Sequence, residues 1–298
     1  MNELRRLLER YPYWPHRPRE ATRAQVTDFA LSILKDAVLT IRETGAVARL
    51  DQPWDSQQLG VRAGRIVPVF PPGSTHAQDA LADALALARN DGYRYLITRV
   101  DAGDLTTVQH LEDAGFRVVD SILSQYLRIG PKVPPTVGRT IGIRPAVEAD
   151  ASSLASITDA SFTESRFHGD PWVGEARARA IYRLWASNLA RGLNDVTLVA
   201  HQADSVVGFL SAKGVAGARE AFGFGIGRIE LVAVAEQHRG LGVVAALTSR
   251  LIEESPARGW SLLGIGTQTS NVRAMRAYAR AGFAPGDSIF TLRWLAPP

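Results

Sequence analysis

Three consecutive stretches decide the fold of the second half of the chain: Ile229-Glu230-Leu231-Val232-Ala233-Val234, Arg239-Gly240-Leu241-Gly242-Val243-Val244, and Ala245-Ala246-Leu247-Thr248-Ser249-Arg250-Leu251-Ile252. They read as an apolar strand, a glycine turn and the start of an amphipathic helix. Glycine lets the backbone approach a ligand closely, and the free N–H groups of a first helical turn point toward an anion. The sequence therefore predicts a phosphate-binding turn at residues 239–245.

The composition is that of an ordinary folded protein. Of the 298 residues, 46% are hydrophobic and 21% are charged. A chain of this length is long enough for two domains. No apolar run reaches membrane-spanning length, and Met1–Arg6 lacks the apolar core of a signal peptide, so we expect a cytoplasmic protein without a membrane partner. The absence of cysteine excludes disulfides and thiolate metal sites, and the six histidines show no metal-ligand spacing, so no metal is predicted.

The net charge is +4, and nearly all of the positive charge is carried by arginine. These arginines are scattered among acidic residues rather than clustered, which disfavours nucleic acid as a partner. Arginine also suits bidentate contacts to phosphate. We therefore expect a small-molecule partner and a phosphorylated ligand.

The chain divides into four predicted segments. Residues 1–45 form an extension that is expected to be helical, because Glu20–Glu43 carries apolar residues at helical spacing. Residues 46–130 form a first α/β domain, 131–140 a linker rich in proline and glycine, and 141–298 a second domain. The extension is expected either to serve a homodimer or to cover the first domain.

An internal repeat relates the two domains. Gly259–Ile289 aligns without gaps on Gly92–Ile122. Each copy reads as strand, polar turn, helix, Gly-Phe and strand, which indicates two related domains with a mixed sheet. The first copy has no Arg-Gly-x-Gly turn, and Leu111 stands where the second copy has Tyr278. We infer that the first domain keeps the architecture and not the site.

The turn, with Asn271 and then Tyr278 seven residues later, resembles the acetyl-CoA site of the GNAT N-acetyltransferases over about 141–295. The resemblance implies that the backbone of the strand end contacts the pantetheine arm, that amides of the turn hold the pyrophosphate, and that the asparagine contacts CoA. It implies that Tyr278 is the general acid that protonates the CoA thiolate. A core aromatic on an amphipathic helix is the alternative for Tyr278, and an N-cap, alone or together with the CoA contact, is the alternative for Asn271. The implied cofactor-binding residues are Val232, Ala233, Val234, Arg239, Gly240, Leu241, Gly242, Val243, Val244, Ala245 and Asn271.

One residue departs from the family pattern. The sixth place of the motif is glycine or alanine in the family, and here it is Val244. A β-branched side chain on the first helical turn would crowd the pyrophosphate while leaving the backbone amides in place, so we expect a tighter or shifted pocket.

Glu230 is the candidate base that takes the proton of the substrate ammonium, directly or through water. A solvated strand carboxylate is the alternative interpretation of this residue.

Within the GNAT enzymes, three short stretches are most similar to the TDP-fucosamine acetyltransferases, which act on a nucleotide-linked amino sugar. They are Pro53–Gly60, Glu164–Trp172 and Tyr182–Gly192. The candidate substrate-binding residues are Arg166, Phe167 and Trp172, since arginine pairs with diphosphate and aromatic rings stack on flat groups. Packing at an exposed turn is the alternative for these three.

The sequence thus predicts an acetyl-CoA-dependent N-acetyltransferase in which a primary amine attacks the thioester directly. Two alternatives stay open. One is a GNAT enzyme acting on another amine, such as an amino acid, a polyamine, an antibiotic or a protein N-terminus. The other is a CoA-binding protein without turnover.

Overall fold

The computed structural model describes residues 1–14, 18, 20–130 and 141–297. The chain forms two compact units: unit 1 comprises Met1–Ile122, Glu220–Phe222 and Asp287–Pro298, and unit 2 comprises Leu123–Arg219 and Gly223–Gly286. These bounds differ from the predicted domains 46–130 and 141–298, because the chain passes from one unit to the other inside two of its strands. The predicted linker 131–140 lies outside the described residues.

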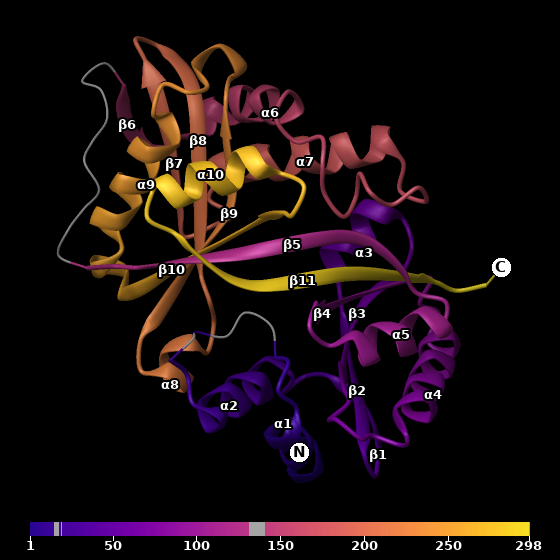
Figure 1. Ribbon diagram of the computed structural model, residues 1–298. Helices are drawn as coiled ribbons and strands as arrows, with labels where there is room; N and C mark the ends of the chain where they lie inside the picture. The colour runs from indigo at the N-terminus through magenta and orange to yellow at the C-terminus, as the bar shows by residue number, and fades with distance from the viewer. Residues whose placement is uncertain (15–17, 19, 131–140, 298) are drawn as a thin grey trace. The chain divides into compact units, whose positions relative to one another are not determined.

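Unit 1 has the strand order β1-β2-β3-β4-β11, in which β3 and β4 are parallel. Its helix α4 packs along β1 and β2 (Figure 1). Strands and a helix, as expected for an α/β domain in this part of the chain, are present as β3, α4 and β4. The elements are α1 (Asn2–Arg10), α2 (Arg23–Ile33), β1 (Val38–Arg42), β2 (Gly45–Asp51), α3 (Pro53–Leu59), β3 (Ala63–Val69), α4 (Ala77–Asn90), β4 (Tyr95–Asp101), α5 (Leu105–Asp113), the first half of β5 (Arg117–Arg128) and most of β11 (Ala284–Leu295).

The helix predicted over Glu20–Glu43 is wrong beyond Ile33. Residues Val38–Arg42 form β1, which pairs with β2 from Val38↔Arg49 to Arg42↔Gly45 across a tight turn at Glu43-Thr44. Most of this strand is β-branched, and such side chains favour strands. The apolar spacing that fits a helix also fits a short strand, and the hairpin partner decides between them.

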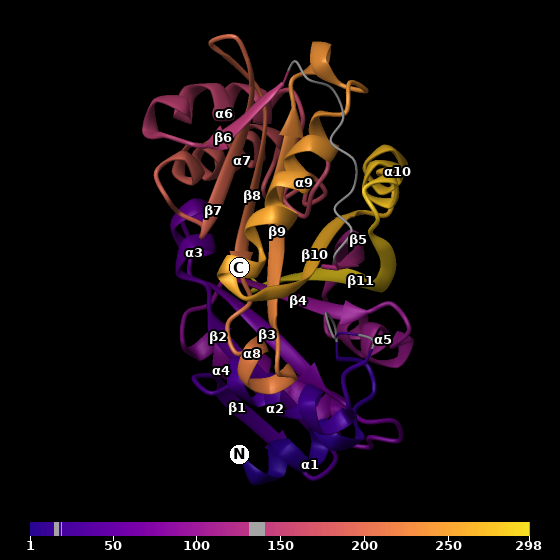
Figure 2. The same cartoon turned by 90° about the vertical axis from the view of Figure 1, so that its left-hand side faces the viewer.

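Unit 2 holds the predicted glycine turn. Its strand order is β5-β10-β9-β8-β7-β6, with β9 and β10 parallel and β6 to β9 antiparallel, so the predicted mixed α/β sheet is confirmed. Helix α9 packs on one face of this sheet (Figure 2). Helix α6 packs on the other face, and α7 packs against α6. The elements are the second half of β5, β6 (Gly142–Pro145), η1 (Glu148–Asp150), α6 (Ala151–Asp159), α7 (Glu175–Ala190), β7 (Val196–Gln202), β8 (Ser205–Gly214), the start of α8 (Ala218–Phe222, whose last residues Glu220–Phe222 belong to unit 1), β9 (Gly225–Val234), η2 (Glu236–His238), α9 (Val243–Glu254), η3 (Pro256–Arg258), β10 (Trp260–Gln268), α10 (Val272–Arg280) and the start of β11.

The internal repeat is present in the structure. In the gapless alignment, the bounds of α10 fall on those of α5 and the bounds of β11 on those of β5, at both ends of each element. The two copies exchange their last strands: β11 runs antiparallel to β4 from Ile289↔Asp101 to Leu295↔Tyr95 in unit 1, and β5 lies next to β10 in the strand order of unit 2. The buried side chains of Leu292 and Trp294 belong to the core of unit 1. The end of the chain therefore completes the first unit.

This exchange predicts that a substitution near the C-terminus destabilises unit 1. Trp294 is 4% exposed and its ring lies 6.5 Å from that of Phe116. Trp294→Ala should lower the free energy of unfolding by about 3–5 kcal/mol, because it removes a large buried ring. Urea unfolding measures the effect, with Trp172→Ala as the control at an exposed tryptophan. Equal effects of the two substitutions would contradict the assignment of Trp294 to a core.

Candidate active site

Strands β9 and β10 part partway along their length. Their parallel pairing runs from Trp260↔Gly225 to Ile265↔Ile229, and among the described residues the two strands do not pair beyond this point. On the other side of β9, Ala212 pairs with Ile229 and Ser211 with Leu231, so Glu230 is the extra residue of a β-bulge. The predicted pantetheine contacts, Val232 to Val234, lie in the part of β9 whose edge toward β10 is unpaired.

The glycine turn joins this strand end to α9. Gly240 and Gly242 both have φ of +80°, a backbone conformation that L side chains rarely adopt. Gly242 is the N-cap residue of α9 and supplies no side chain to cap it. The first N–H groups of a helix have no partner within the helix. The turn therefore presents backbone donors beside the parted strands.

The side chain of Arg239 is engaged within the unit. Its Nε donates to the carbonyl oxygen of Val234 at 3.2 Å, and its Nη2 donates to the carbonyl oxygen of Ala160 at 3.0 Å and to Ser161 Oγ at 3.3 Å. These bonds tie the turn to the end of β9 and to the end of α6. The guanidinium thus acts as a brace, which leaves the backbone of the turn as the predicted phosphate contact.

The three apolar residues of the motif have different surroundings. Val243 is buried and its methyl group lies beside Gly208, whereas Leu241 is 58% exposed. Val244 is partly buried and packs against the core cluster that contains Leu247 and Leu251. Its side chain therefore packs toward the core. This placement favours a turn whose backbone amides stay open to a phosphate over a turn that the valine crowds.

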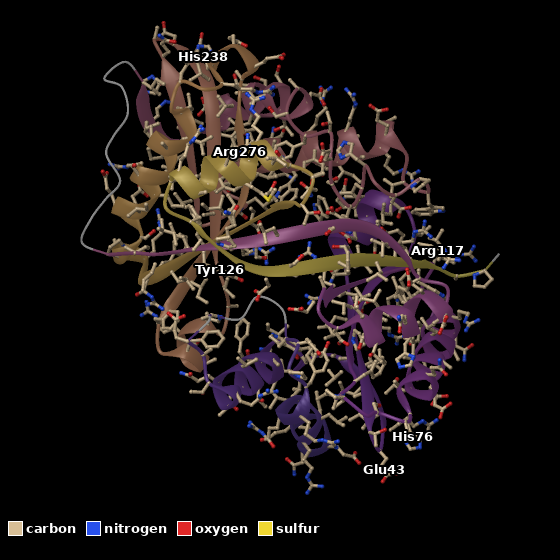
Figure 3. All side chains as sticks on the ribbon, viewed as in Figure 1. Glu43, His76, Arg117, Tyr126, His238 and Arg276 are labelled. Atoms are coloured by element: carbon tan, nitrogen blue, oxygen red, sulfur yellow. The ribbon has the colours of Figure 1, made fainter. Side chains whose placement is uncertain are left out.

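Helix α10 carries the two side chains predicted for the second half of the site. Asn271 is its N-cap, with Oδ1 accepting from the N–H of Ala274 at 3.0 Å, while Nδ2 has no partner among the described residues. Tyr278 is the buried residue of this helix, and its ring meets that of Phe283 edge-on at 6.3 Å. Burial raises the pKa of the Tyr278 phenol well above its ordinary value. Arg276 lies on the exposed side of α10 (Figure 3).

Glu230 belongs to a small polar group on the sheet. Asn194 Nδ2 lies 3.3 Å from Glu230 Oε2 and 2.8 Å from Ser211 Oγ, and Ser211 in turn contacts Thr197. Glu230 is half-buried. The bulge and this amide contact hold the carboxylate in place, which is an arrangement that a base needs and that a freely solvated carboxylate lacks.

The segment between α6 and α7 carries the predicted substrate contacts in unequal surroundings. Phe167 is 2% exposed and its ring lies against that of Tyr182, so its surroundings are those of a packed residue. The guanidinium of Arg166 lies 3.9 Å from the centroid of the Phe167 ring. Trp172 is 37% exposed, with Arg177 beside its ring. Of the three, Trp172 is placed best for a stacking contact.

His168, in the same segment, was not predicted from the sequence. Its Nδ1 lies 2.8 Å from Ser165 Oγ, which accepts the N–H groups of Phe167 and His168 and is thus the donor to the imidazole. The ring is neutral in that arrangement, and its buried Nε2 has no hydrogen-bond partner among the described residues. Burial, followed by the charge of Arg179, lowers its pKa. A single histidine without a partner at motif spacing carries no signal in the sequence.

A second contact joins this segment to α10: Ser270 Oγ donates to Glu164 Oε2 at 2.5 Å. Ser270 precedes Asn271, and Arg239 reaches Ala160 and Ser161 at the start of the same segment. Both turns that border the parted strands are therefore tied to the segment between α6 and α7.

Within the described ranges, no group of three histidine, aspartate or glutamate side chains is arranged to hold a metal ion. No described helix combines the length and the apolar character that are needed to cross a membrane.

Comparison with known proteins gives consistent results. Residues 153–283 match the model of the acetyltransferase (GNAT) family. The spore coat polysaccharide biosynthesis protein SpsD of Bacillus subtilis is 25% identical over 88% of this chain and 86% of its own. A dTDP-fucosamine acetyltransferase of Escherichia coli O6:H1 is 26% identical over 77% of this chain and 90% of its own. A tandem GNAT protein from the clavulanic acid biosynthesis pathway shares the fold, with a TM-score of 0.56 at 16% identity over 100% of this chain and 95% of that one.

The two roles of Asn271 can be separated by substitution. Asn271→Asp keeps an N-cap oxygen for the N–H of Ala274 but replaces the Nδ2 donor by an anionic oxygen. Asn271→Ala removes both and should cost about 1 kcal/mol of stability. We expect Asn271→Asp to retain the thermal stability and to bind CoA several-fold more weakly in calorimetric titration. Unchanged CoA affinity of Asn271→Asp would leave this residue as a cap alone.

Proposed function

We propose that this chain, whose residues 153–283 match the model of the GNAT acetyltransferase family, transfers an acetyl group from acetyl-CoA to a primary amine by direct attack on the thioester. The observation that carries the proposal is the parting of β9 and β10 beside the turn at Gly240–Gly242. The edge of Val232–Val234 that faces β10, opposite the edge paired with β8, would receive the pantetheine arm, and the first amides of α9 would receive the pyrophosphate.

The bond changes follow from direct attack. The amine nitrogen forms a bond to the acetyl carbon, the bond from that carbon to sulfur breaks, and CoA leaves as a thiol. The ammonium form of the acceptor first loses a proton to Glu230, directly or through water, and Tyr278 supplies a proton to the departing sulfur. The nitrogen loses a second proton as the amide forms, and that proton restores the Tyr278 phenol. The chain has no cysteine, so no acetyl-cysteinyl intermediate forms on it.

The burial of Tyr278 bears on its role as the acid. Because its pKa is raised, the phenol is fully protonated at neutral pH. A thiolate that forms in the same apolar surroundings is also destabilised by the loss of solvent, which raises the pKa of the CoA thiol. The two groups therefore shift in the same direction, and proton transfer from the phenol stays feasible when CoA is enclosed beside it.

The proposed acceptor is the amine of a nucleotide-linked amino sugar. The name of one relative specifies dTDP-fucosamine acetylation, and that of another specifies polysaccharide biosynthesis. The segment between α6 and α7 offers the exposed ring of Trp172, which suits stacking on a base or a sugar face of such a substrate.

A panel of amines tests the proposal. The purified chain is incubated with acetyl-CoA and with dTDP-linked amino sugars, free amino sugars, amino acids, polyamines and peptides, and the released CoA is measured with a thiol reagent. We expect the highest kcat/KM with a nucleotide-linked amino sugar. Turnover with only another class of amine would show that the proposed acceptor is wrong. If the chain binds CoA but releases none with any amine, the proposal of an enzyme would give way to that of a CoA-binding protein.

The assignment of the acid predicts a selective loss of rate. Tyr278→Phe should lower kcat by roughly a hundredfold or more, the range of general acid catalysis, because the ring and its packing remain while the proton donor is lost. The affinity for CoA should stay close to that of the wild type. Tyr93→Phe, which changes a tyrosine of unit 1, is the matched control and should leave kcat unchanged. Near-normal turnover of Tyr278→Phe would remove this residue from the mechanism.

A further inference from the structure

Unit 1 retains the turn that corresponds to the glycine turn of unit 2. When the gapless alignment of the two copies is continued toward the N-terminus, Gly240 falls on Gly73, and both glycines have φ of +80°. Helix α4 begins at Ala77 after this turn, as α9 begins at Val243. Strands β3 and β4 are parallel like β9 and β10, and they pair from Ala63↔Tyr95 to Arg65↔Ile97. The backbone of a cofactor site is thus repeated in unit 1.

The donors of this second turn are bonded to a residue of the N-terminal extension. Thr44, at the tip of the β1–β2 hairpin, accepts at Oγ1 from the N–H of Thr75 at 3.1 Å and from the N–H of His76 at 3.2 Å. The same oxygen lies 3.1 Å from His76 Nδ1. Glu43 and His76 mark this corner of unit 1 in Figure 3. One hydroxyl therefore satisfies backbone N–H groups that correspond in position to the proposed phosphate donors of unit 2.

The counterpart of Asn271 is bonded in the same way. Asp104 falls on Asn271 in the alignment of the two copies and, like it, caps its helix, with Oδ1 accepting from the N–H of Thr107 at 3.2 Å. Its second oxygen accepts from Tyr11 Oη at 2.7 Å, in a buried contact. Asn271 offers an N–H₂ donor at this place, whereas Asp104 offers a carboxylate oxygen, which needs a donor such as a phenol.

Tyr11 is firmly held as that donor. Its side chain is 5% exposed, and the neighbouring helix α1 buries Leu4, Leu7 and Leu8. Arg23 Nη1 also donates to the carbonyl oxygen of Tyr11 at 2.9 Å. Burial and the nearby Asp104 raise the pKa of the Tyr11 phenol well above its ordinary value, so the group remains a donor.

We infer that Thr44 and Tyr11 are built-in occupants of the cofactor surface of the first repeat, with Thr44 at the phosphate turn and Tyr11 at the Asp104 cap. The repeat therefore keeps its backbone geometry without a soluble ligand, and the chain binds one CoA, in unit 2. The identity of the excluded ligand as CoA rests on the proposed function. The internal contacts themselves do not.

Hydrogen exchange of the full-length chain tests the contacts. Thr44→Val removes the hydroxyl with little change of shape, and the amides of Thr75 and His76 should then exchange roughly three- to tenfold faster, as expected for the loss of one hydrogen bond. Tyr11→Phe should speed exchange at Thr107 and Val108 by a similar factor. The matched controls are Thr40→Val in β1 and Tyr13→Phe, which should leave these amides unchanged. Unchanged exchange in both Thr44→Val and Tyr11→Phe would overturn the inference.

Saturation with CoA tests the occupancy. In the wild type, CoA should slow exchange of the amides at 242–246 and leave those of Thr75, His76 and Thr107 as they were, and calorimetry should give one site per chain. Protection of the unit 1 amides, or a second CoA site, would contradict the inference. A chain that binds no CoA would refute the proposed function instead, while the Thr44→Val and Tyr11→Phe results would still decide the inference.

Discussion

The first N–H groups of a helix need hydrogen-bond acceptors from outside the helix, and both units are built around this requirement. In each unit a strand ends, the chain turns through a glycine with positive φ, and a helix starts against the sheet, which leaves backbone donors directed out of the turn. In unit 1 these donors are bonded to Thr44. In unit 2, Gly242 supplies no capping side chain, and we propose that an anionic group of the cofactor meets the same requirement. One backbone geometry thus gives an internal contact in one unit and a proposed binding site in the other.

The elements predicted from the sequence are those with a local signal. The strand before the glycine turn, the helix after it and the cap at Asn271 follow from hydrophobic period, glycine and asparagine chemistry, and all three are present. The gapless repeat predicted more than single elements, because it related α10 and β11 to α5 and β5 residue by residue. These features need no knowledge of which segments meet in space.

What the sequence could not give depends on contacts between distant residues. Val38–Arg42 fits a helix until β2 is known as its partner, and no local rule states that β11 pairs with β4. The role of Arg239 is a similar case: its place in the motif suggests a phosphate ligand, whereas its guanidinium reaches Ala160, which is distant in the sequence. His168 matters only because Ser165 orients its ring and burial isolates Nε2.

The bracing of the segment between α6 and α7 links the two proposed substrates. Arg239 holds one end of this segment to the phosphate turn, and Ser270 holds Glu164 beside the cap of α10. A cofactor that orders the turn and the cap would therefore also order the side chains proposed to contact the acceptor. The coupling requires no long pathway, because each contact is a single hydrogen bond between neighbouring elements. Acceptor binding should then depend on CoA through the same hydrogen bonds that position the turn. Arg239 and Ser270 therefore act as positioning residues, which do not need to touch the reacting atoms.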